Sequence, residues 1–251
     1  MKRLTGKVAI VTGASRGIGK GIATVLGREG AAVVVAARSI TERDRIPGTV
    51  GETAAEIEAG GGTAIPVQCD VTQEESVHSL FEQVLGEFGR IDLLINNAGG
   101  SGTFAPVEGY PLHRFDRVVT LNIRGTFLCC RAAIPPMSRQ GGGIIINVSS
   151  DSGQYIAFPN DAVYGLVKAA IERLTLGLAE EVRERDISVV ALWPAKVRTE
   201  GAQAIHPPDF DWTDWINPED VGQPVVDIAS GIAPRYSGQV LDVRRYGIDW
   251  P

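Results

Sequence analysis

The sequence predicts an α/β fold in which one doubly wound, seven-stranded parallel sheet carries helices on both faces. Short, apolar, β-branched runs alternate along the chain with stretches of helical period, a pattern typical of fully buried strands joined by crossover helices. A glycine-rich turn joins the first such run to the first helix. The 251 residues, 44 % of them hydrophobic, are enough for one core, and neither a linker nor an internal repeat divides them. A single domain over residues 1–251 is therefore expected.

The apolar runs and the breaks between them define the expected elements. Strands are expected at residues 8–11, 33–37, 65–67, 91–95, 144–148, 187–192 and 239–243. Helices are expected after the glycine-rich turn as far as residue 30, over 53–59, from 72 to 88, over 112–137 with a break at 135–136, from 162 onward and from 218. Thr72 and Glu75 have the spacing of a capping box for the third helix. Residues 39–50 are too polar to be core, and 200–217 are expected as a flexible lid or loop.

Charge and cysteine content exclude several classes of protein. A net charge of −6 and a pI near 5.2 argue against a surface for nucleic acid or anionic membrane. Three cysteines form no disulfide framework, so we expect them to pack as small apolar groups in a reducing, cytoplasmic compartment. The sequence shows no signal peptide and no membrane span, and nothing in it calls for a metal.

The turn after the first strand has the pattern Gly13-x-x-x-Gly17-x-Gly19 and opens a helix. Glycines let the backbone approach a pyrophosphate, and the helix N-terminus offers free N–H groups with about half a positive charge. A strand, a glycine turn and a helix in this order are the first half of a dinucleotide-binding unit.

Two arginines indicate which dinucleotide is bound. An acidic residue at the end of the second strand would bind the ribose 2′-hydroxyl of NAD, but Ala37 and Arg38 stand there. Arg16 in the glycine turn is a second cation, and guanidinium groups match phosphate oxygens well. NADP(H) is therefore favoured and NAD(H) remains possible. The alternative is that both arginines are solvated surface residues.

Other polar residues follow the central strands. Asp70 could accept a hydrogen bond from an adenine amino group or serve only as a turn residue, and its spacing favours neither. Asn96-Asn97-Ala98-Gly99 suits a crevice where a cofactor lies against backbone. Asn122 lies between apolar neighbours in a helix, where an asparagine is often a core amide or the site of a kink.

Tyr164 and Lys168 are four residues apart on the helix that begins near Ala162, so they share a face. A free phenol titrates near pH ~10, and a neighbouring ammonium lowers its pKa toward the working range of an acid–base catalyst. Ser150 could hold a reacting oxygen at the end of the preceding strand. Taken alone, the pair could equally be a surface Tyr–Lys pair with Ser150 as a turn residue.

Together these residues resemble the short-chain dehydrogenase/reductase family, from Lys7 to about Val243. The resemblance implies a single Rossmann-type domain in which Tyr164 is the general acid/base, Ser150 binds the substrate oxygen and Lys168 lowers the tyrosine pKa and bonds the nicotinamide ribose. It implies that Asn122 holds a water in a proton relay. The cofactor contacts that it implies are Gly13, Ser15, Arg16, Gly17, Ile18, Gly19, Arg38, Asp70, Val71, Asn97, Ala98, Gly99, Tyr164, Lys168, Pro194, Val197 and Thr199.

The chain departs from the family pattern in three places. Tyr164 lies fourteen positions after Ser150 where thirteen is usual, so Ser149 and Ser152 are possible substitutes for Ser150. The usual Pro-Gly is Pro194-Ala195. Paired glycines near the C-terminus are replaced by residues 244–247.

The main hypothesis is an NADP(H)-dependent oxidoreductase that interconverts a carbonyl and an alcohol. The alternative is a non-catalytic regulatory protein that binds NADP(H); a sugar-nucleotide epimerase would need a longer C-terminal domain. Aromatic side chains indicate an apolar substrate pocket under the lid or simply pack the lid: Tyr155, Phe158, Trp193, Phe210, Trp212 and Trp215. The resemblance also implies a homodimer or homotetramer, formed through the helices that carry Asn122 and Tyr164.

Overall fold

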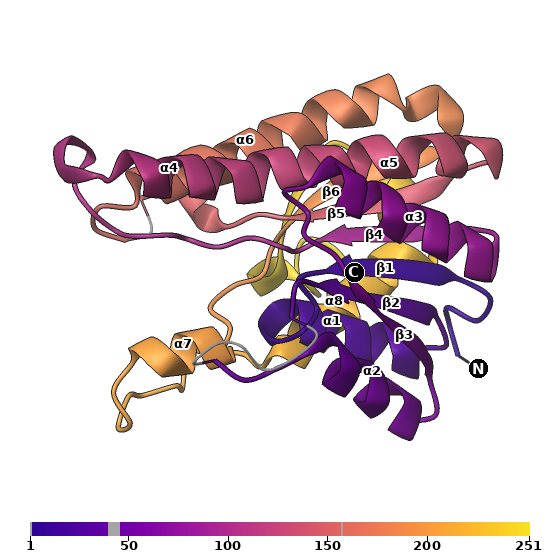
Figure 1. Ribbon diagram of the computed structural model, residues 1–251, viewed down its shortest axis with the longest axis horizontal. Coiled ribbons are helices and arrows are strands. Elements are labelled where there is room, and N and C mark those ends of the chain that lie inside the picture. The colour runs from indigo at the N-terminus through magenta and orange to yellow at the C-terminus, as the bar shows by residue number, and fades with distance from the viewer. Residues whose placement is uncertain (1, 40–45, 157) are drawn as a thin grey trace.

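The computed structural model describes residues 2–39, 46–156 and 158–251. These residues form one parallel seven-stranded sheet in the order β3-β2-β1-β4-β5-β6-β7 (Figure 1). The predicted fold class is confirmed. The strands are β1 Val8–Thr12, β2 Ala32–Ala37, β3 Thr63–Gln68, β4 Leu93–Asn96, β5 Gly143–Val148, β6 Ile187–Trp193 and β7 Val240–Asp242. The order reverses between β1 and β4, where a doubly wound sheet opens a crevice at the carboxyl ends of its strands.

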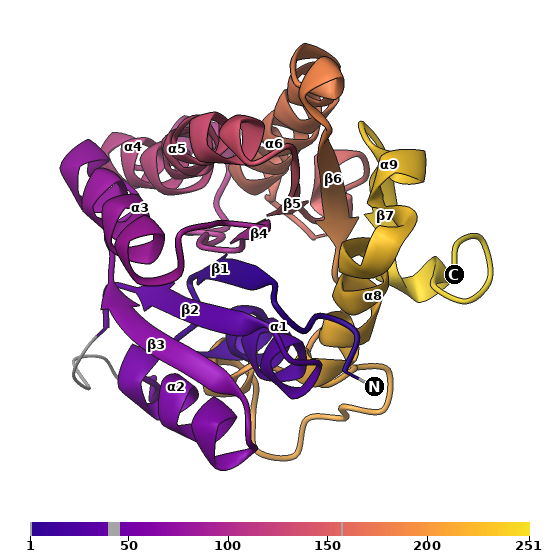
Figure 2. The same ribbon diagram turned by 90° about the vertical axis from the view of Figure 1, so that its right-hand side faces the viewer.

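Helices cover both faces of the sheet (Figure 2). One face carries α1 Gly17–Arg28, α2 Val50–Ala59 and α8 Gly222–Asp227; the other carries α3 Glu74–Phe88, α4 Leu112–Val119, α5 Gly125–Arg139 and α6 Ala162–Glu181. The short helices α7 Glu200–Ile205 and α9 Ala233–Tyr236 complete the α-helices described. Single turns occur at η1 Val107–Gly109, η2 Thr120–Arg124, η3 Asp151–Gly153, η4 Arg183–Arg185, η5 Pro218–Val221, η6 Ile228–Ile232 and η7 Val243–Arg245.

The strands divide the core into two layers because alternate side chains point to opposite faces. In β1, Ala9 and Val11 pack with α1 and α2, whereas Val8 and Ile10 pack with α3 and α5. All five residues of β1 are buried. The near-continuous apolar runs of the sequence therefore reflect burial on both faces. As predicted, the three cysteines are buried and unpaired.

The predicted capping box at Thr72 and Glu75 is wrong. The helix α3 begins at Glu74, and its N-cap residue Gln73 makes no side-chain capping bond. The Thr72 hydroxyl instead donates to the carboxylate of Asp70 at 2.7 Å, so it is not available to the helix. A capping box does form at α2, between Thr49 and Glu52.

The predicted break at Pro135–Pro136 is also wrong, because both prolines lie inside α5. The irregular turn is instead the π-helical η2, which separates α4 from α5. There the side-chain amide of Asn122 donates to the carbonyl of Val118, one turn earlier, at 2.9 Å. The polar side chain, rather than the prolines, therefore marks the irregularity.

The two expected loops differ in how much the structure describes. Of the loop over 39–50, residues 40–45 lie outside the described residues, and Val50 already belongs to α2. The expected lid at 200–217 begins with the helix α7, which lies away from the sheet in Figure 1.

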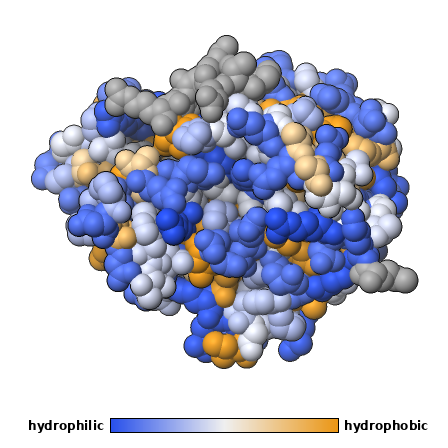
Figure 3. All heavy atoms as spheres, turned by 90° about the horizontal axis from the view of Figure 1, so that it is seen from below, coloured by the Kyte–Doolittle hydropathy of each residue, from blue (hydrophilic) through white to orange (hydrophobic). Residues whose placement is uncertain are grey.

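Hydrophilic side chains cover most of the face seen in Figure 3, with hydrophobic ones in small separate groups. Among the described residues, no helix is both long enough and apolar enough to span a membrane. This face therefore offers solvent a largely hydrophilic surface.

Close packing of α1 against η5 yields a stability prediction. A Cβ at Gly21 would lie 2.2 Å from the carbonyl carbon of Pro218, so we expect Gly21→Ala to destabilise the fold by about 1–3 kcal/mol. Gly86, in α3, has open space around it. Gly86→Ala is expected to leave the stability unchanged or raise it by up to ~1 kcal/mol. Urea unfolding of both variants tests this, and equal effects would contradict it.

Candidate active site

The carboxyl ends of β1 and β4 are joined by side-chain hydrogen bonds at the point where the strand order reverses. The Thr12 hydroxyl accepts from the backbone N–H groups of Asn97 and Ala98 at 3.0 and 3.1 Å. The Asn97 amide donates to the carbonyl oxygens of Thr12 and Gly13 at 2.9 and 3.1 Å. These bonds fix the glycine turn against the segment that follows β4.

The glycine turn lies too close to its neighbours to carry side chains. A Cβ at Gly13 would lie 2.8 Å from Cα of Ala98, and one at Gly19 would lie 2.4 Å from the side-chain nitrogen of Asn97. Gly13 and Gly17 also have positive φ values of 65° and 58°. The glycines are therefore required both by the turn and by close backbone approach.

A cavity of about 220 Å³ lies beside this turn. Its lining is Gly13, Ser15, Arg16, Ala37, Arg38, Ser39, Cys69, Val71, Ala98, Gly99 and Leu121. Seven residues expected to contact the cofactor thus come together here: Gly13, Ser15, Arg16, Arg38, Val71, Ala98 and Gly99. Backbone groups, small residues and two arginines fit the adenosine end of a dinucleotide.

Arg16 and Arg38 line this cavity from two segments, and their contact with a 2′-phosphate stays a prediction. The Arg16 guanidinium also donates to the carbonyl of Gly48 at 3.2 Å. Asp70 makes the bonds of a turn residue, because its carboxylate accepts from both the N–H and the hydroxyl of Thr72. A contact between Asp70 and adenine stays a prediction.

The segment after β6 passes over the glycine turn. Pro194 is buried, and Ala195 adopts a left-handed conformation with φ 61°, which a glycine would adopt without strain. Val197 is buried and pairs with Ile216. Thr199 approaches Gly17, and the Glu200 carboxylate accepts from the Gly17 N–H at 2.8 Å. The Glu200 carboxylate thus satisfies a backbone N–H in the first turn of α1 that would otherwise have no acceptor within the helix.

Lys168 lies on the buried side of α6, with 6 % of its surface exposed. Its ammonium donates to the carbonyl of Val148 at 3.0 Å and lies 5.5 Å from the centre of the Tyr164 ring. Burial lowers the pKa of Lys168 to about 8, although the charge of Glu172 opposes that shift. The helical spacing has therefore brought a cation to the tyrosine, as the sequence predicts.

Ser150 is the serine that forms a hydrogen bond with Tyr164. The pKa of the Tyr164 phenol is raised, chiefly by burial and also by the charge of Asp151, while the bond with Ser150 lowers it. The expected lowering of this pKa by Lys168 is therefore wrong for this structure, because burial outweighs it. The two alternative serines lie elsewhere: the Ser149 hydroxyl donates to Glu172 at 2.8 Å, and Ser152 is buried. The geometry thus favours Ser150 over its neighbours.

Asn122 is completely buried in η2. Its amide donates to the carbonyl oxygens of Val118 and Gly100 at 2.9 and 3.0 Å, and its oxygen accepts from the Gly100 N–H at 3.3 Å. The residue thus fixes the loop after β4. Its expected water and its place in a proton relay stay predictions.

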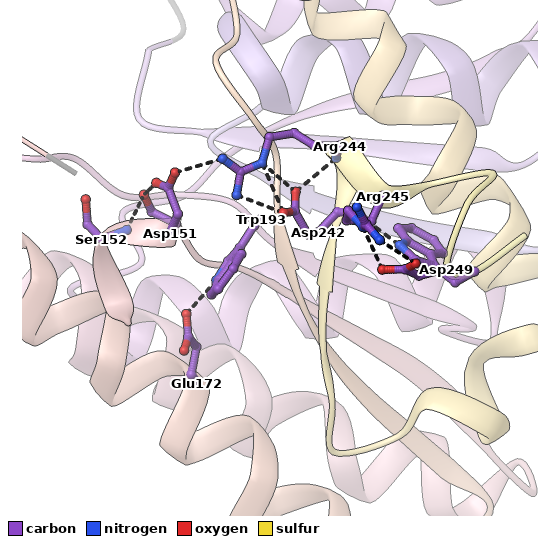
Figure 4. Close-up of polar contacts among 10 residues, drawn as sticks. Asp151, Ser152, Glu172, Trp193, Asp242, Arg244, Arg245 and Asp249 are labelled. Carbon is purple, nitrogen blue, oxygen red and sulfur yellow. Dashed lines mark hydrogen bonds and ion pairs between the residues drawn. The ribbon is translucent and has the colours of Figure 1, made fainter. Parts of the chain in front are cut away.

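An ion-pair cluster that the sequence does not predict lies at the end of β7. Arg244 pairs with Asp242 at 2.8 Å and with Asp151, the neighbour of Ser150, at 3.3 Å (Figure 4). The Ser150 hydroxyl in turn donates to Asp151 at 3.2 Å. The C-terminal turn is thereby connected to the candidate catalytic serine. An acid that follows Ser150 directly was the available signal, but nothing in the sequence identifies its partner.

The aromatic residues near the candidate site and in the lid form three separate groups. Phe104 packs against Phe158 and against the Tyr164 ring, with centroids 5.7 and 6.3 Å apart. Tyr155 packs against Trp193. Phe210, Trp212 and Trp215 instead surround His206 in the segment after α7, where each ring contacts the others. The lid rings thus pack with one another, and Phe104, absent from the expected pocket, lies beside Tyr164.

A doubly wound sheet with a glycine turn at its switch point and a Tyr–Lys pair beside the same crevice defines the class of dinucleotide-dependent oxidoreductases. The sequence model of the short chain dehydrogenase family matches residues 7–209. The chain belongs to the short-chain dehydrogenase/reductase family of oxidoreductases, which act on CH–OH groups and use NAD(P)(H).

Individual relatives support the same family. The chain is 38 % identical over 193 residues to hydroxysteroid dehydrogenase-like protein 2 of Danio rerio, a match covering 76 % of this chain but 46 % of that protein. It is 36 % identical to dehydrogenase/reductase SDR family member 1 of Mus musculus, covering 98 % and 83 % of the two chains. A solved 7α-hydroxysteroid dehydrogenase complexed with NADH and 7-oxo glycochenodeoxycholic acid is similar with a TM-score of 0.84, 29 % identity and coverage of 96 % and 93 %.

The charge of Asp151 gives a prediction about Tyr164. Because that charge raises the phenol pKa, Asp151→Asn should move the ionisation of Tyr164 to lower pH, whereas Ser150→Ala should move it to higher pH. Tyrosinate absorbance during a pH titration measures this, once the titration of the matching Tyr164→Phe variant has been subtracted. Shifts in the same direction for both variants would contradict the assignment.

Proposed function

We propose that this chain is an NADP(H)-dependent oxidoreductase that interconverts a carbonyl and an alcohol. The observation that supports it most is the arrangement on α6: the Tyr164 phenol is hydrogen-bonded to Ser150 and lies over the buried Lys168 ammonium. The glycine-lined cavity supplies the second part of such a site, because its residues fit a dinucleotide.

Each side chain has a separate role in this proposal. Bound NADP(H) supplies or accepts the hydride. Tyr164 gives a proton to the carbonyl oxygen, or takes it from the alcohol, and Ser150 holds that oxygen by a hydrogen bond. The Lys168 ammonium, which lies over the Tyr164 ring, bonds the nicotinamide ribose, and Asn122 keeps the loop after β4 in position.

The preference for NADP(H) rests on Arg16 and Arg38. Both line the cavity beside the end of β2, where Ala37 takes the place that an acid would have in an NAD-selective site. Guanidinium groups are positively charged and form paired hydrogen bonds with phosphate oxygens, so they suit the 2′-phosphate of NADP(H).

The substrate that we propose is an apolar carbonyl or alcohol. Phe104, Tyr155 and Phe158 are 43 %, 64 % and 46 % exposed beside Tyr164 and Trp193, so they offer an apolar surface at the reacting phenol. Hydroxysteroid dehydrogenases among the similar proteins are consistent with a bulky apolar substrate.

Self-association through α5 and α6 is part of the proposal. Phe127 on α5 and Leu166 and Leu176 on α6 are each about half exposed, at 49 %, 48 % and 56 %. The two helices lie side by side in Figure 1. A second copy of the chain packed on these helices would cover the three side chains. The cytoplasmic location expected from the cysteines stays a separate prediction.

The direct test follows NADPH and NADH consumption against a panel of ketones, aldehydes and quinones. Turnover with NADPH is expected, and Tyr164→Phe should lower kcat by at least about a hundredfold because it removes the proton donor. Fluorescence titration should show that the variant still binds NADPH. Full activity of Tyr164→Phe would contradict the catalytic role, and a preference for NADH would contradict the role of the arginines. Binding without any turnover would favour a regulatory protein.

The contact between Glu200 and Gly17 gives a prediction about cofactor affinity. The carboxylate occupies an N–H of the α1 N-terminus, where a pyrophosphate would bind. Glu200→Gln should therefore tighten NADPH binding by roughly two- to fivefold, the effect of one charge at a helix end. Glu219→Gln, near Arg28 at the other end of α1, is the matched control and should leave the Kd unchanged. Weaker binding by Glu200→Gln would contradict this.

A further inference from the structure

A buried carboxylate lies one helical turn beyond Lys168 and has no role in the proposed reaction. Glu172 is 9 % exposed, and its carboxylate accepts three hydrogen bonds. The indole N–H of Trp193 donates at 2.6 Å, the hydroxyl of Ser149 at 2.8 Å and the amide of Gln154 at 3.0 Å. Figure 4 shows the indole of Trp193 directed at Glu172.

The three donors come from three separate segments, and each adjoins a residue of the candidate site. Ser149 precedes Ser150 at the end of β5, Gln154 follows η3 and precedes Tyr155, and Trp193 precedes Pro194 at the end of β6. One carboxylate on α6 therefore attaches the serine loop, an exposed aromatic residue and the segment leading to the lid to the helix that carries Tyr164.

The backbone of η3 approaches the Glu172 carboxylate closely. A Cβ at Gly153 would lie 2.5 Å from Oε1 of Glu172, so the glycine in η3 allows the loop to approach the acid. Side chains larger than hydrogen at residue 153 would displace either the loop or the carboxylate.

The charge of Glu172 also acts on Lys168, because the two residues are i and i+4 on α6. The groups that face this pair come from all the elements packed around it. In the described part of the chain they are Tyr164 on α6, the Val148 carbonyl and Ser149 from β5, Asp151 and Gln154 from η3 and its end, Trp193 from β6, and Arg244, which pairs with Asp151. The charge that raises the pKa of Lys168 is that of its partner in the pair, Glu172.

We propose that Glu172 is a positioning residue of the active site. Its carboxylate holds the segments of Ser150, Tyr155 and Pro194 on α6 and supplies the negative charge that keeps the Lys168 ammonium protonated. This inference rests on the proposed function, since it assumes that Tyr164 and Lys168 act together.

The experiment compares the pH dependence of kcat for carbonyl reduction in Glu172→Gln, Glu172→Asp and the native enzyme. Carbonyl reduction needs both Tyr164 and Lys168 in their protonated forms. Because the two groups interact, the pKa at which the first proton is lost is a property of the pair and not of either residue. A nearby carboxylate opposes that loss whichever group gives up the proton. Glu172→Gln should therefore move the alkaline limb down by about one pH unit, and Glu172→Asp, which keeps the charge, should leave it in place.

The matched control is Glu180→Gln, which removes an exposed carboxylate from the same helix and should leave the profile unchanged. Superimposable alkaline limbs for Glu172→Gln and the native enzyme would overturn the electrostatic role. Equal shifts for the Gln and Asp variants, or a shift for Glu180→Gln, would overturn it too.

Trp193→Phe tests the positioning role even if Glu172→Gln does not fold. It removes one donor and keeps both the ring and the charge of Glu172, so kcat should fall severalfold with the alkaline limb unmoved. An unchanged kcat would overturn this role. Tyr164→Phe in the same assay separates the two claims: if it is fully active, the proposed function fails, whereas an inactive Tyr164→Phe with an unmoved Glu172→Gln profile overturns the Glu172 inference alone.

Discussion

The structure around the candidate site depends on the burial of one ammonium group. Lys168 is removed from water, and burial favours its neutral form, so its pKa is lowered to about 8. The Val148 carbonyl and the Glu172 charge favour the protonated form and so oppose this lowering of the pKa. A lowered lysine pKa means that the unfolded chain binds more protons between pH 8 and 10.5, so this group disfavours the fold below that window and the cost is relieved as pH rises through it. The chain thus keeps a locally unfavourable charge beside Tyr164.

Side-chain hydrogen bonds hold the elements around that charge. Asn96 at the end of β4 donates to Asn147 in β5 at 2.9 Å, and Asn147 donates to Thr175 on α6 at 2.9 Å. This buried series places α6 relative to the sheet, while Thr12 and Asn97 place the glycine turn relative to β4. The two halves of the candidate site therefore share one rigid support, the carboxyl ends of the central strands.

The sequence predicts the sheet well because strands buried on both faces are nearly continuous apolar runs, as in β1 and β6. It also predicts the glycine turn and the Tyr164–Lys168 pair, because a short spacing within one element already determines how these residues lie. Two local signals predicted the wrong structure. The Thr72 hydroxyl bonds to Asp70, two residues earlier, instead of capping a helix. Pro135 lies inside α5 instead of breaking it.

Contacts between distant segments were beyond prediction. A single glutamate such as Glu172 on an amphipathic helix is indistinguishable in sequence from a solvated one, and only the fold shows that it is buried against Ser149 and Trp193. Arg244 and Asp151 are 93 positions apart, so no spacing rule connects them. The family pattern favours Ser150, but it is the hydrogen bond to Tyr164 that separates it from Ser149 and Ser152.

The pKa of Lys168 tests this account most directly. Side-chain NMR of protein with labelled lysine can follow each ammonium through a pH titration, with Lys168→Met to assign the signal. The other lysines, Lys2, Lys7, Lys20 and Lys196, are exposed or half-buried, so their signals differ in environment. The account predicts that Lys168 titrates at about 8. A Lys168 pKa near its ordinary value of 10.5 would contradict it.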